Sequence, residues 1–205
     1  MTTGRPRASS REVLSEAACE LFLERGFDAT SITEIAARAG VSRSSFFNYF
    51  ESKEEILWSS LDQRVARLES AVPVSDPVAA LRHLCDGFEP DSLALALVNA
   101  EAMGLTDELE RGAAVRQARI ARAVAASVVA KGAEPVEAAV CGAAHAGAVM
   151  IALERWARAG AGRASLAGGR AGANGCVAVP FDAAHLRSLM ISSADVGEMV
   201  MRALI

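Results

Sequence analysis

Apolar residues recur at helical spacing near the N-terminus of this 205-residue chain. Residues 13–22 carry two adjacent rows of them, and such rows place their members on one face of a helix. The rows are formed by Val13, Ala17 and Leu21, and by Leu14, Ala18 and Phe22. Gly26 follows, and glycine commonly ends a helix. The pattern therefore predicts a first helix that stops at Gly26.

Three serine–glutamate pairs, each spaced by three residues, mark helix starts in the first 58 residues. In such a capping box, each side chain accepts a hydrogen bond from the backbone N–H of the other residue. The pairs are Ser9 with Glu12, Ser31 with Glu34, and Ser52 with Glu55. The second pair predicts a short helix that ends at Gly40, and the third predicts a long helix through Leu68. Ser42 can cap another short helix that runs to about Tyr49.

The residues after Pro73 also predict helices, introduced by prolines or capping side chains. One expected helix starts at Asp76–Pro77, and the next runs from Pro90 through Leu93 to Met103. Two longer helices are expected from Thr106 to about Ala130 and from Pro135 to about Trp156. The last predicted helical segments are Phe181 to Ile191 and Val196 to Ile205. Six of the sixteen glycines fall between Gly160 and Gly175, so we expect residues 160–180 to form a flexible loop. The chain as a whole is predicted to be all-α.

Composition supports a packed helical protein. Hydrophobic residues make up 52% of the chain and charged residues 22%, a balance that allows a substantial core. Residues 1–11 lack the apolar segment of a secretory signal. The apolar stretch from Ala138 to Leu153 falls short of the roughly 18 to 20 strongly apolar residues of a membrane span. The four cysteines form no Cys-x-x-Cys pair, so we expect no metal, no cofactor and a location in the reducing cytoplasm.

The charge distribution argues against a general basic patch. Residues 1–53 contain seven basic and seven acidic side chains, and the remaining residues contain 14 basic and 18 acidic ones. The net charge of −4 therefore arises in the larger C-terminal part. Any binding of nucleic acid must depend on a few well-placed groups in the N-terminal part.

Residues 31–49 have the proportions of a helix-turn-helix. Gly40 supplies the positive φ that the sharp turn needs. The inward positions would be Ile35, Ala36, Val41, Phe46 and Phe50, and the outward positions Arg43, Ser44, Ser45, Asn48 and Tyr49. Arg43 can read guanine or bind a phosphate, and Asn48 can bond to base edges. Three hydroxyls, those of Ser44, Ser45 and Tyr49, can fix the register on the DNA backbone.

Five further residues complete the expected DNA-binding set. Thr30 and Lys53 lie at helix N-termini, where backbone donors favour phosphate, and Ser42 caps the recognition helix. Arg5 and Arg7 on a flexible arm could add a phosphate or minor-groove contact, although they could equally be a solvated tail. The alternative for the whole segment is three packed helices with polar surfaces and no ligand.

An ordered series of short motifs over about residues 9–60 resembles the N-terminal signature of the tetracycline-repressor (TetR) family. The motifs are Gly26-Phe27-Asp28-Ala29-Thr30-Ser31-Ile32, Ile35-Ala36, Ala39-Gly40-Val41-Ser42, Phe46-Phe47-Asn48-Tyr49-Phe50 and Ser52-Lys53-Glu54-Glu55-Ile56-Leu57. The stretch from Phe46 to Lys53 and residues 152–156 are also similar to a mycofactocin-regulator-like subgroup. Two positions depart from the family: Ser44 replaces a frequent glycine, and Phe47 replaces a tyrosine whose hydroxyl would bond to phosphate. Tyr49 could offset that loss.

The resemblance implies a homodimer with two recognition helices in successive major grooves of a palindromic operator. It also implies a variable C-terminal domain whose ligand releases the DNA. We accordingly expect a DNA-binding domain over residues 1–53 and an effector-binding and dimerisation domain over residues 54–205. The expected function is that of a transcriptional regulator, most often a repressor in this family.

Polar residues in the apolar C-terminal part are candidates for an effector pocket: His83, Asn99, Glu101, Met103, Arg116 and His145. Each also has a structural alternative. Glu101 can pair with Arg116 or Arg119, Asn99 can be a satisfied core amide, Met103 can be ordinary core, and His145 can lie at a subunit contact. An apolar interior with few polar groups predicts a small, largely apolar effector.

A strip of small residues in the predicted helix 135–156 allows close approach of another helix. The strip consists of Ala139, Gly142, Ala143, Ala146 and Gly147. Two-fold symmetry would place it in a four-helix interface between subunits, and the alternative is packing within one subunit. Two rival functions are an activator or nucleoid-type DNA binder without effector, and a small-molecule enzyme or carrier. The sequence contains no catalytic triad, paired carboxylates, metal spacing or phosphate loop, so no catalytic residues are expected.

Overall fold

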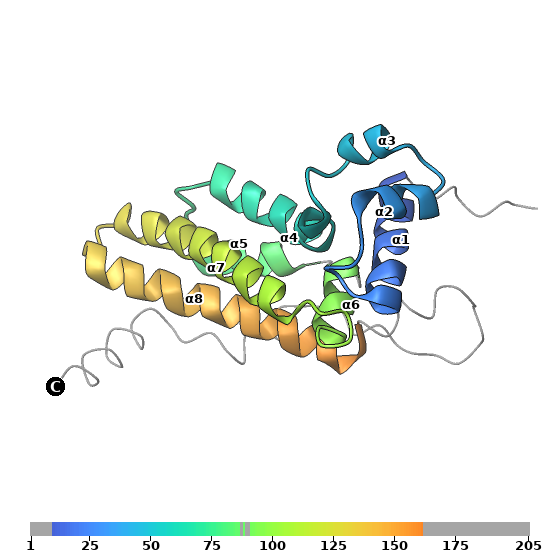
Figure 1. The fold of residues 1–205 in the computed structure, drawn as a ribbon. Helices are drawn as coiled ribbons and strands as arrows, with labels where there is room; N and C mark the ends of the chain where they lie inside the picture. The colour runs from blue at the N-terminus through green and yellow to red at the C-terminus, as the bar shows by residue number, and fades with distance from the viewer. Residues whose placement is uncertain (1–9, 87, 89–90, 162–205) are drawn as a thin grey trace, which may run out of the picture.

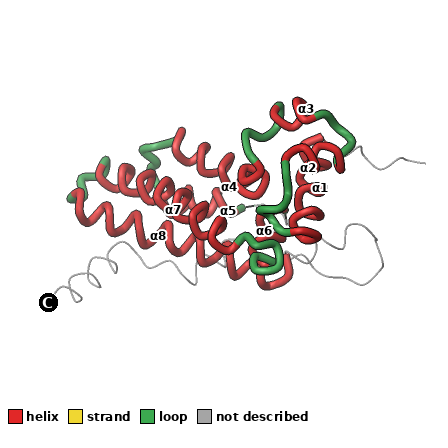
Figure 2. The backbone as a smooth tube through the Cα atoms, viewed as in Figure 1, coloured by secondary structure: helices red, strands yellow, loops and turns green. Residues whose placement is uncertain are grey.

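The computed structural model describes residues 10–86, 88 and 91–161, and their regular structure is entirely helical (Figures 1 and 2). The helices are α1 (Ser10–Arg25), α2 (Ile32–Arg38), α3 (Arg43–Phe47), α4 (Lys53–Ser70), α5 (Pro77–Cys85), α6 (Ser92–Val98), α7 (Thr106–Val129) and α8 (Pro135–Trp156), followed by a π-helical turn, Ala157–Ala161. The all-α prediction is confirmed. The Arg5 and Arg7 arm, Ser9, nearly all of the predicted glycine-rich loop and both predicted terminal helices lie outside the described residues.

Capping side chains define the N-terminal helices as the sequence predicted. Ser31 accepts a hydrogen bond from the Glu34 N–H at 3.3 Å, and Glu34 accepts one from the Ser31 N–H at 2.9 Å. Ser52 likewise accepts from the Glu55 N–H, but the Glu55 carboxylate accepts from the N–H of Glu51 and not from that of Ser52. In the third capping box, the backbone N–H that bonds to the glutamate therefore belongs to the residue before the predicted serine.

Two glycines end helices in the left-handed region, where a side chain would be strained. Gly26 has φ +83° after α1, and Gly40 has φ +70° after α2. The Val41 N–H then donates to the Ala36 carbonyl at 2.9 Å, which closes the turn before α3. The tight turn of the predicted helix-turn-helix is present.

The prediction of one helix from Pro90 to Met103 was wrong at both ends. Asp91 caps α6 by accepting hydrogen bonds from the N–H groups of Leu93 and Ala94 at 3.0 and 3.1 Å. The helix stops at Val98. Thr106 also does not cap α7, because Leu105 occupies the cap position without a side-chain bond. The apolar run extends beyond the helix because residues such as Met103 are buried in the turn.

The helices form one continuous hydrophobic core. In Figure 1, α1, α2 and α3 lie at one end, α7 and α8 run side by side as the long hairpin at the other, and α4 lies between them. Side chains of α1, α4 and α8 are fully buried in this core, including Phe22, Trp58 and Trp156. The position of α4 lets one helix contact the N-terminal unit and the long hairpin.

Helix α8 continues into the π-helical turn and gives a longer apolar helix than the sequence pattern indicated. The 25 residues from Pro135 to Ala159 include a window of mean hydropathy 1.7, so this helix is long and apolar enough to cross a membrane by length and composition alone. The expectation that the stretch falls short is therefore wrong. Half of the window is buried inside the structure, and the core helix of a helical bundle meets the same criterion.

Candidate nucleic-acid interface

Helix α3 is fixed to the rest of the N-terminal unit by its apolar side. Phe46 and Phe50 are buried, with ring centroids 5.7 Å apart, and Ile35 and Ala36 of α2 are buried beside them in the same core. The helix is shorter than expected because it ends at Phe47, but the Tyr49 N–H donates to the Phe46 carbonyl at 2.9 Å and continues the turn. The buried face matches the sequence prediction.

The opposite side of α3 is open to solvent, at the outer edge of the molecule in Figure 1. Its exposed side chains are Ser42, Arg43, Ser44, Phe47, Asn48 and Tyr49, with Ser45 half-buried. Phe47 and Tyr49 are 47% and 37% exposed. The predicted outward positions therefore do face outward, and Phe47 joins them. We call these seven residues the α3 outer face.

The serines of the α3 outer face bond mainly to one another. The Ser42 hydroxyl caps α3 by accepting from the Ser45 N–H at 3.1 Å. It also lies 2.8 Å from the hydroxyl oxygens of both Ser44 and Ser45. These hydroxyls stabilise the start of the helix. The other side chains of the α3 outer face take no part in this hydroxyl cluster: Arg43, Phe47, Asn48 and Tyr49.

Charge pairing separates Arg43 from the other arginines of the N-terminal unit. Arg38 bonds to Glu24 at 2.8 Å and to Glu20 at 3.1 Å, and Arg25 bonds to Glu34 at 2.8 Å. The contacts with Glu24 and Glu20 raise the pKa of Arg38, and Arg38 in turn lowers the pKa of the Glu24 carboxyl. The pKa of the Glu34 carboxyl is lowered mainly by the hydrogen bonds that it accepts from Ser31, with a smaller effect of Arg25.

Arg11 lies 3.9 Å from Glu55 and 4.6 Å from the ring centroid of Phe50. Within residues 10–53, the described structure leaves Arg43 as the arginine with no carboxylate within 4.0 Å. Its guanidinium instead lies 5.7 Å from the Phe47 ring centroid. The free cationic group of this unit is therefore on α3.

Two residues of the predicted DNA-binding set point inward. Thr30 is 2% exposed, and its hydroxyl donates to the Gly26 carbonyl at 2.8 Å. The half-buried Lys53 donates to the carbonyls of Phe27 and Thr30 at 2.7 and 3.3 Å, and its ammonium lies 4.0 Å from the Phe27 ring centroid. Both side chains hold the turn between α1 and α2. The burial of Thr30 corrects its assignment to a phosphate contact, and the assignment of the half-buried Lys53 stays a prediction. Their position at helix starts could not show which way they point.

The same turn is attached to the C-terminal part of the chain. The Phe27 N–H donates to the Met103 carbonyl at 2.7 Å, and Met103 itself is fully buried. Lys53 at the start of α4 holds the Phe27 carbonyl from the other side. The turn between α1 and α2 is thus bonded both to α4 and to the segment before α7.

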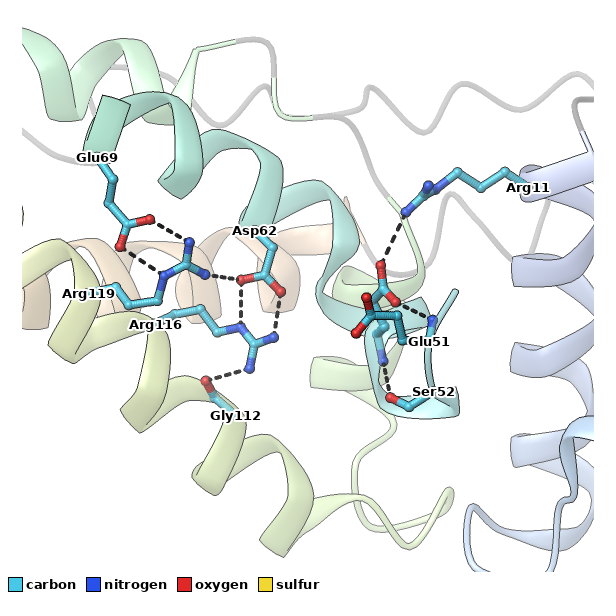
Figure 3. Close-up of polar contacts among 9 residues, drawn as sticks. Arg11, Glu51, Ser52, Asp62, Glu69, Gly112, Arg116 and Arg119 are labelled. Carbon is cyan, nitrogen blue, oxygen red and sulfur yellow. Dashed lines mark hydrogen bonds and ion pairs between the residues drawn. The ribbon is translucent and has the colours of Figure 1, made fainter. Parts of the chain in front are cut away.

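Arg116, an expected pocket residue, belongs to an ion-pair cluster between α4 and α7 (Figure 3). It makes two hydrogen bonds to Asp62, at 3.1 and 2.5 Å, and its guanidinium lies 4.6 Å from the Trp58 ring centroid. Arg119 bridges Asp62 at 2.7 Å and Glu69 at 2.7 Å. The cluster joins two helices that are 54 residues apart in sequence at Asp62 and Arg116, so sequence spacing gave no signal for it.

The other expected pocket residues do not converge. His83 is exposed and lies 3.5 Å from Asp86, and Glu101 is exposed as well. Asn99 donates to the Leu95 carbonyl at 2.9 Å, and Met103 is part of the hydrophobic core. Neither Arg116 nor Arg119 pairs with Glu101 among the described contacts. The structure therefore does not assemble the predicted effector site from these residues.

His145 remains the candidate with an unsatisfied polar atom. Its ring is 4% exposed, and Nδ1 lies 2.8 Å from the Cys141 carbonyl of the same helix. Among the described residues, the buried Nε2 atom has no hydrogen-bond partner. Burying such an atom without a partner costs free energy, so a ligand with a complementary polar group would gain from it.

The small-residue strip of α8 divides between two faces. Gly142 lies against α7, where a Cβ would collide with the Ala121 carbonyl oxygen, and Ala146 is fully buried. These two residues serve packing within the subunit, and their assignment to a subunit interface is corrected. Ala139 and Ala143 are exposed and Gly147 is half-buried, on the side that also carries Val136 and Ile151.

Comparison with known proteins was made for sequence and for structure. Residues 14–58 match the family model "Bacterial regulatory proteins, tetR family". The chain is 34% identical over 79 residues to the protein named mycofactocin biosynthesis transcriptional regulator MftR of Mycobacterium tuberculosis, covering 38% of this chain and 40% of that protein. It is 42% identical over 67 residues to the transcriptional activator FasR of Mycolicibacterium smegmatis, covering 33% and 31%.

One shorter sequence match and one solved structure were also found. The chain is 44% identical over 48 residues to the transcriptional repressor DhaR of a Mycobacterium species, covering 23% of this chain and 24% of that protein. The crystal structure of Mycobacterium smegmatis AmtR is 22% identical, covers 99% of this chain and 98% of its own, and has a TM-score of 0.44. The sequence matches thus span less than half the length of these relatives. Over residues 14–58, the N-terminal helix-turn-helix segment matches the DNA-binding domain of the TetR family of bacterial regulatory proteins.

Proposed function

We propose that this protein binds a specific DNA operator through the α3 outer face and regulates transcription there. The observation that carries the proposal is the charge pattern: the other described arginines of the N-terminal unit lie beside carboxylates, whereas Arg43 projects from α3 without one. A free guanidinium can bond to the O6 and N7 atoms of guanine in the major groove. Asn48 and Tyr49, exposed beside it, can contact base edges and the DNA backbone.

The proposal includes a homodimer on a palindromic operator. The exposed side of the α7–α8 hairpin carries large apolar side chains, with Val136 76% and Ile151 50% exposed. The exposed Ala139 and Ala143 would let a second copy approach this side closely. A dimer would present two α3 helices to half-sites about 34–36 Å apart, which is one turn of the duplex.

We further propose that a small, largely apolar effector releases the protein from DNA. The buried Nε2 of His145 supports a hydrogen bond to such a molecule. The bond between Phe27 and Met103 offers a route by which residues 54–205 could reposition the DNA-binding residues 1–53. Repression is the expected sign of control, and the matched relatives include both DhaR, named a repressor, and FasR, named an activator. The protein would act in the cytoplasm.

Selection of duplexes from a random-sequence library by the purified full-length protein tests the DNA-binding proposal. We expect an enriched palindrome with half-sites one helical turn apart, and a binding constant that falls steeply as salt concentration rises. Sedimentation of the same sample should give a dimer. Absence of enrichment, or a monomer that binds all duplexes equally, would overturn the proposal.

A thermal-shift screen of small apolar compounds tests the effector proposal. Compounds that raise the Tm are then added to the complex with the selected duplex, and release of the DNA is expected. The variant His145→Ala should lose both responses to these compounds while it still binds the duplex. A releasing compound that acts equally on this variant would remove His145 from the effector site.

A further inference from the structure

Phe47 is an exposed aromatic ring in the middle of a polar surface. It is 47% exposed, although its neighbours in sequence include the fully buried Phe46. Its ring meets Phe46 edge-on, with centroids 5.4 Å apart and planes at 80°. Phe46 therefore supports the inner edge of the ring and leaves the rest in solvent. Exposure of so much apolar surface brings no gain to the folded subunit, because burying it would be favourable.

Phe47 and Arg43 share one side of α3. Residues four positions apart are neighbours on a helix surface, and the Arg43 guanidinium lies 5.7 Å from the Phe47 ring centroid. With no carboxylate within 4.0 Å in the described structure, the ring is the contact that orients this guanidinium. Two groups held side by side would meet adjacent base pairs when α3 enters a groove.

Chemistry limits what an exposed phenylalanine can recognise in the major groove. Its ring carries no hydrogen-bond donor and no conventional acceptor, so it cannot read the polar base edges. The apolar group that the groove presents is the C5-methyl of thymine.

We infer that Phe47 is a specificity-determining residue that contacts the C5-methyl group of a thymine next to the guanine read by Arg43. This inference rests on the proposed DNA-binding function and adds the base that the α3 outer face selects. It assigns one thymine per half-site to Phe47, beside the guanine assigned to Arg43. The competing outcome is a contact of the ring with deoxyribose, for which the binding constant would not depend on the thymine methyl group.

Replacing single thymines by deoxyuridine in the selected duplex tests the inference, because this change removes only the methyl group. Burial of one methyl-sized group is worth about fourfold in Kd. We expect one position per half-site where the replacement raises the Kd about fourfold, and about fifteenfold when both half-sites are changed. That position should adjoin a guanine whose replacement by 7-deazaguanine also weakens binding.

Three variants assign the effect to Phe47. Phe47→Ala should bind thymine and deoxyuridine duplexes equally, whereas Phe47→Tyr keeps the ring and should retain the fourfold preference. Tyr49→Ala removes the neighbouring exposed aromatic ring and should weaken both duplexes while it keeps the preference. Thermal unfolding of each variant checks that the N-terminal unit is intact.

The outcomes separate this inference from the proposed function. An enriched palindrome without any methyl-sensitive thymine would overturn the role of Phe47 and leave DNA recognition by α3 standing. A preference that persists in Phe47→Ala would assign the methyl contact to another residue and also overturn the inference. Failure to enrich any duplex would overturn the proposed function and this inference together.

Discussion

Arg43 on α3 and Arg116 on α7 are both arginines placed over aromatic rings, but their surroundings differ in every other respect. Arg43 lies 5.7 Å from the Phe47 ring centroid, is exposed, and has no carboxylate within 4.0 Å in the described structure. Arg116 lies 4.6 Å from the Trp58 ring centroid, makes two hydrogen bonds to Asp62, and donates to the Gly112 carbonyl at 3.1 Å. Its side chain is only 16% exposed.

The contrast shows how partners decide what an arginine does. A guanidinium has five donors in a fixed fork, and Asp62 together with the Gly112 carbonyl occupies the fork of Arg116. The fork of Arg43 is free to bond to a guanine or a phosphate. Both arginines were predicted to lie in ligand-binding sites, but Arg116 is bonded within the protein, and the DNA contact of Arg43 stays a proposal. We expect loss of Arg43 to affect binding and loss of Arg116 to affect folding.

Arg43→Ala should give the largest change. Each half-site would lose a bidentate contact worth about 1–3 kcal/mol, so the Kd of a dimer for its selected duplex should rise about a hundredfold or more. Fluorescence anisotropy with the labelled duplex measures the change. Arg25→Ala is the matched control, because Arg25 is exposed but paired with Glu34, and it should bind nearly as the parent does. Equal loss in both variants would remove the distinction between free and paired arginines.

Arg116→Ala should lower the free energy of unfolding by about 2–3 kcal/mol. The reason is the loss of charge-assisted hydrogen bonds to Asp62 and of the stacking on Trp58. Urea unfolding followed by circular dichroism measures it. The folded variant should keep the operator affinity of the parent within a few-fold. A variant that stays fully stable but loses DNA binding would reverse the assignment of the two arginines.

Gly112→Ala tests the packing beneath Arg116. A Cβ at Gly112 would lie 2.6 Å from Cε2 and 2.7 Å from Cζ2 of Trp58, so the indole must move. Overpacking of this kind costs about 1–3 kcal/mol. Gly147→Ala is the control, since its Cβ would find the Gln117 Nε2 atom at 3.7 Å and no closer neighbour. Thermal unfolding should show a lower Tm for the first variant and an unchanged or higher Tm for the second.

Glu69→Gln should give the smallest change, and the change should depend on pH. The Arg119 guanidinium holds the pKa of the Glu69 carboxyl below its ordinary value of 4.5. A carboxyl with a lowered pKa in the folded state adds stability above its unfolded pKa, and this stability is lost as the pH falls through the folded value. The pair is partly exposed, so the deficit of the variant at pH 7 should be less than about 1 kcal/mol. It should disappear as the pH drops below 4.5, and a deficit that is constant with pH would contradict the ion pair.

Features that depend on neighbours in sequence were predicted well. The Ser31–Glu34 box, the Gly26 and Gly40 turns and the Asp76–Pro77 start of α5 each involve residues within a few positions of one another, and each is present. The exposed side of α3 also followed from helical spacing around Phe46 and Phe50. Local backbone chemistry is sufficient for such features because their hydrogen bonds close within one turn.

Features that depend on partners from other helices were not predicted. Asp62 comes to Arg116 because α4 lies along α7, and Lys53 bonds to the carbonyls of Phe27 and Thr30 because α4 starts beside the first turn. No pattern within a single helix distinguishes a lysine that binds phosphate from one that holds a loop. The same holds for Gly142 and Ala146, whose partner helix decided which face of α8 they serve.

The amino-acid sequence by itself determined the helical class, the position of most helix ends in the N-terminal unit and the family signature in residues 14–58. It did so because caps, glycine turns and apolar periodicity act over a few residues. Tertiary structure alone decided which polar side chains form hydrogen bonds or ion pairs within the protein and which remain available to a ligand. Charges and hydrogen-bonding groups find their partners across space, so only the packing of α4, α7 and α8 could separate Arg116 and Lys53 from Arg43.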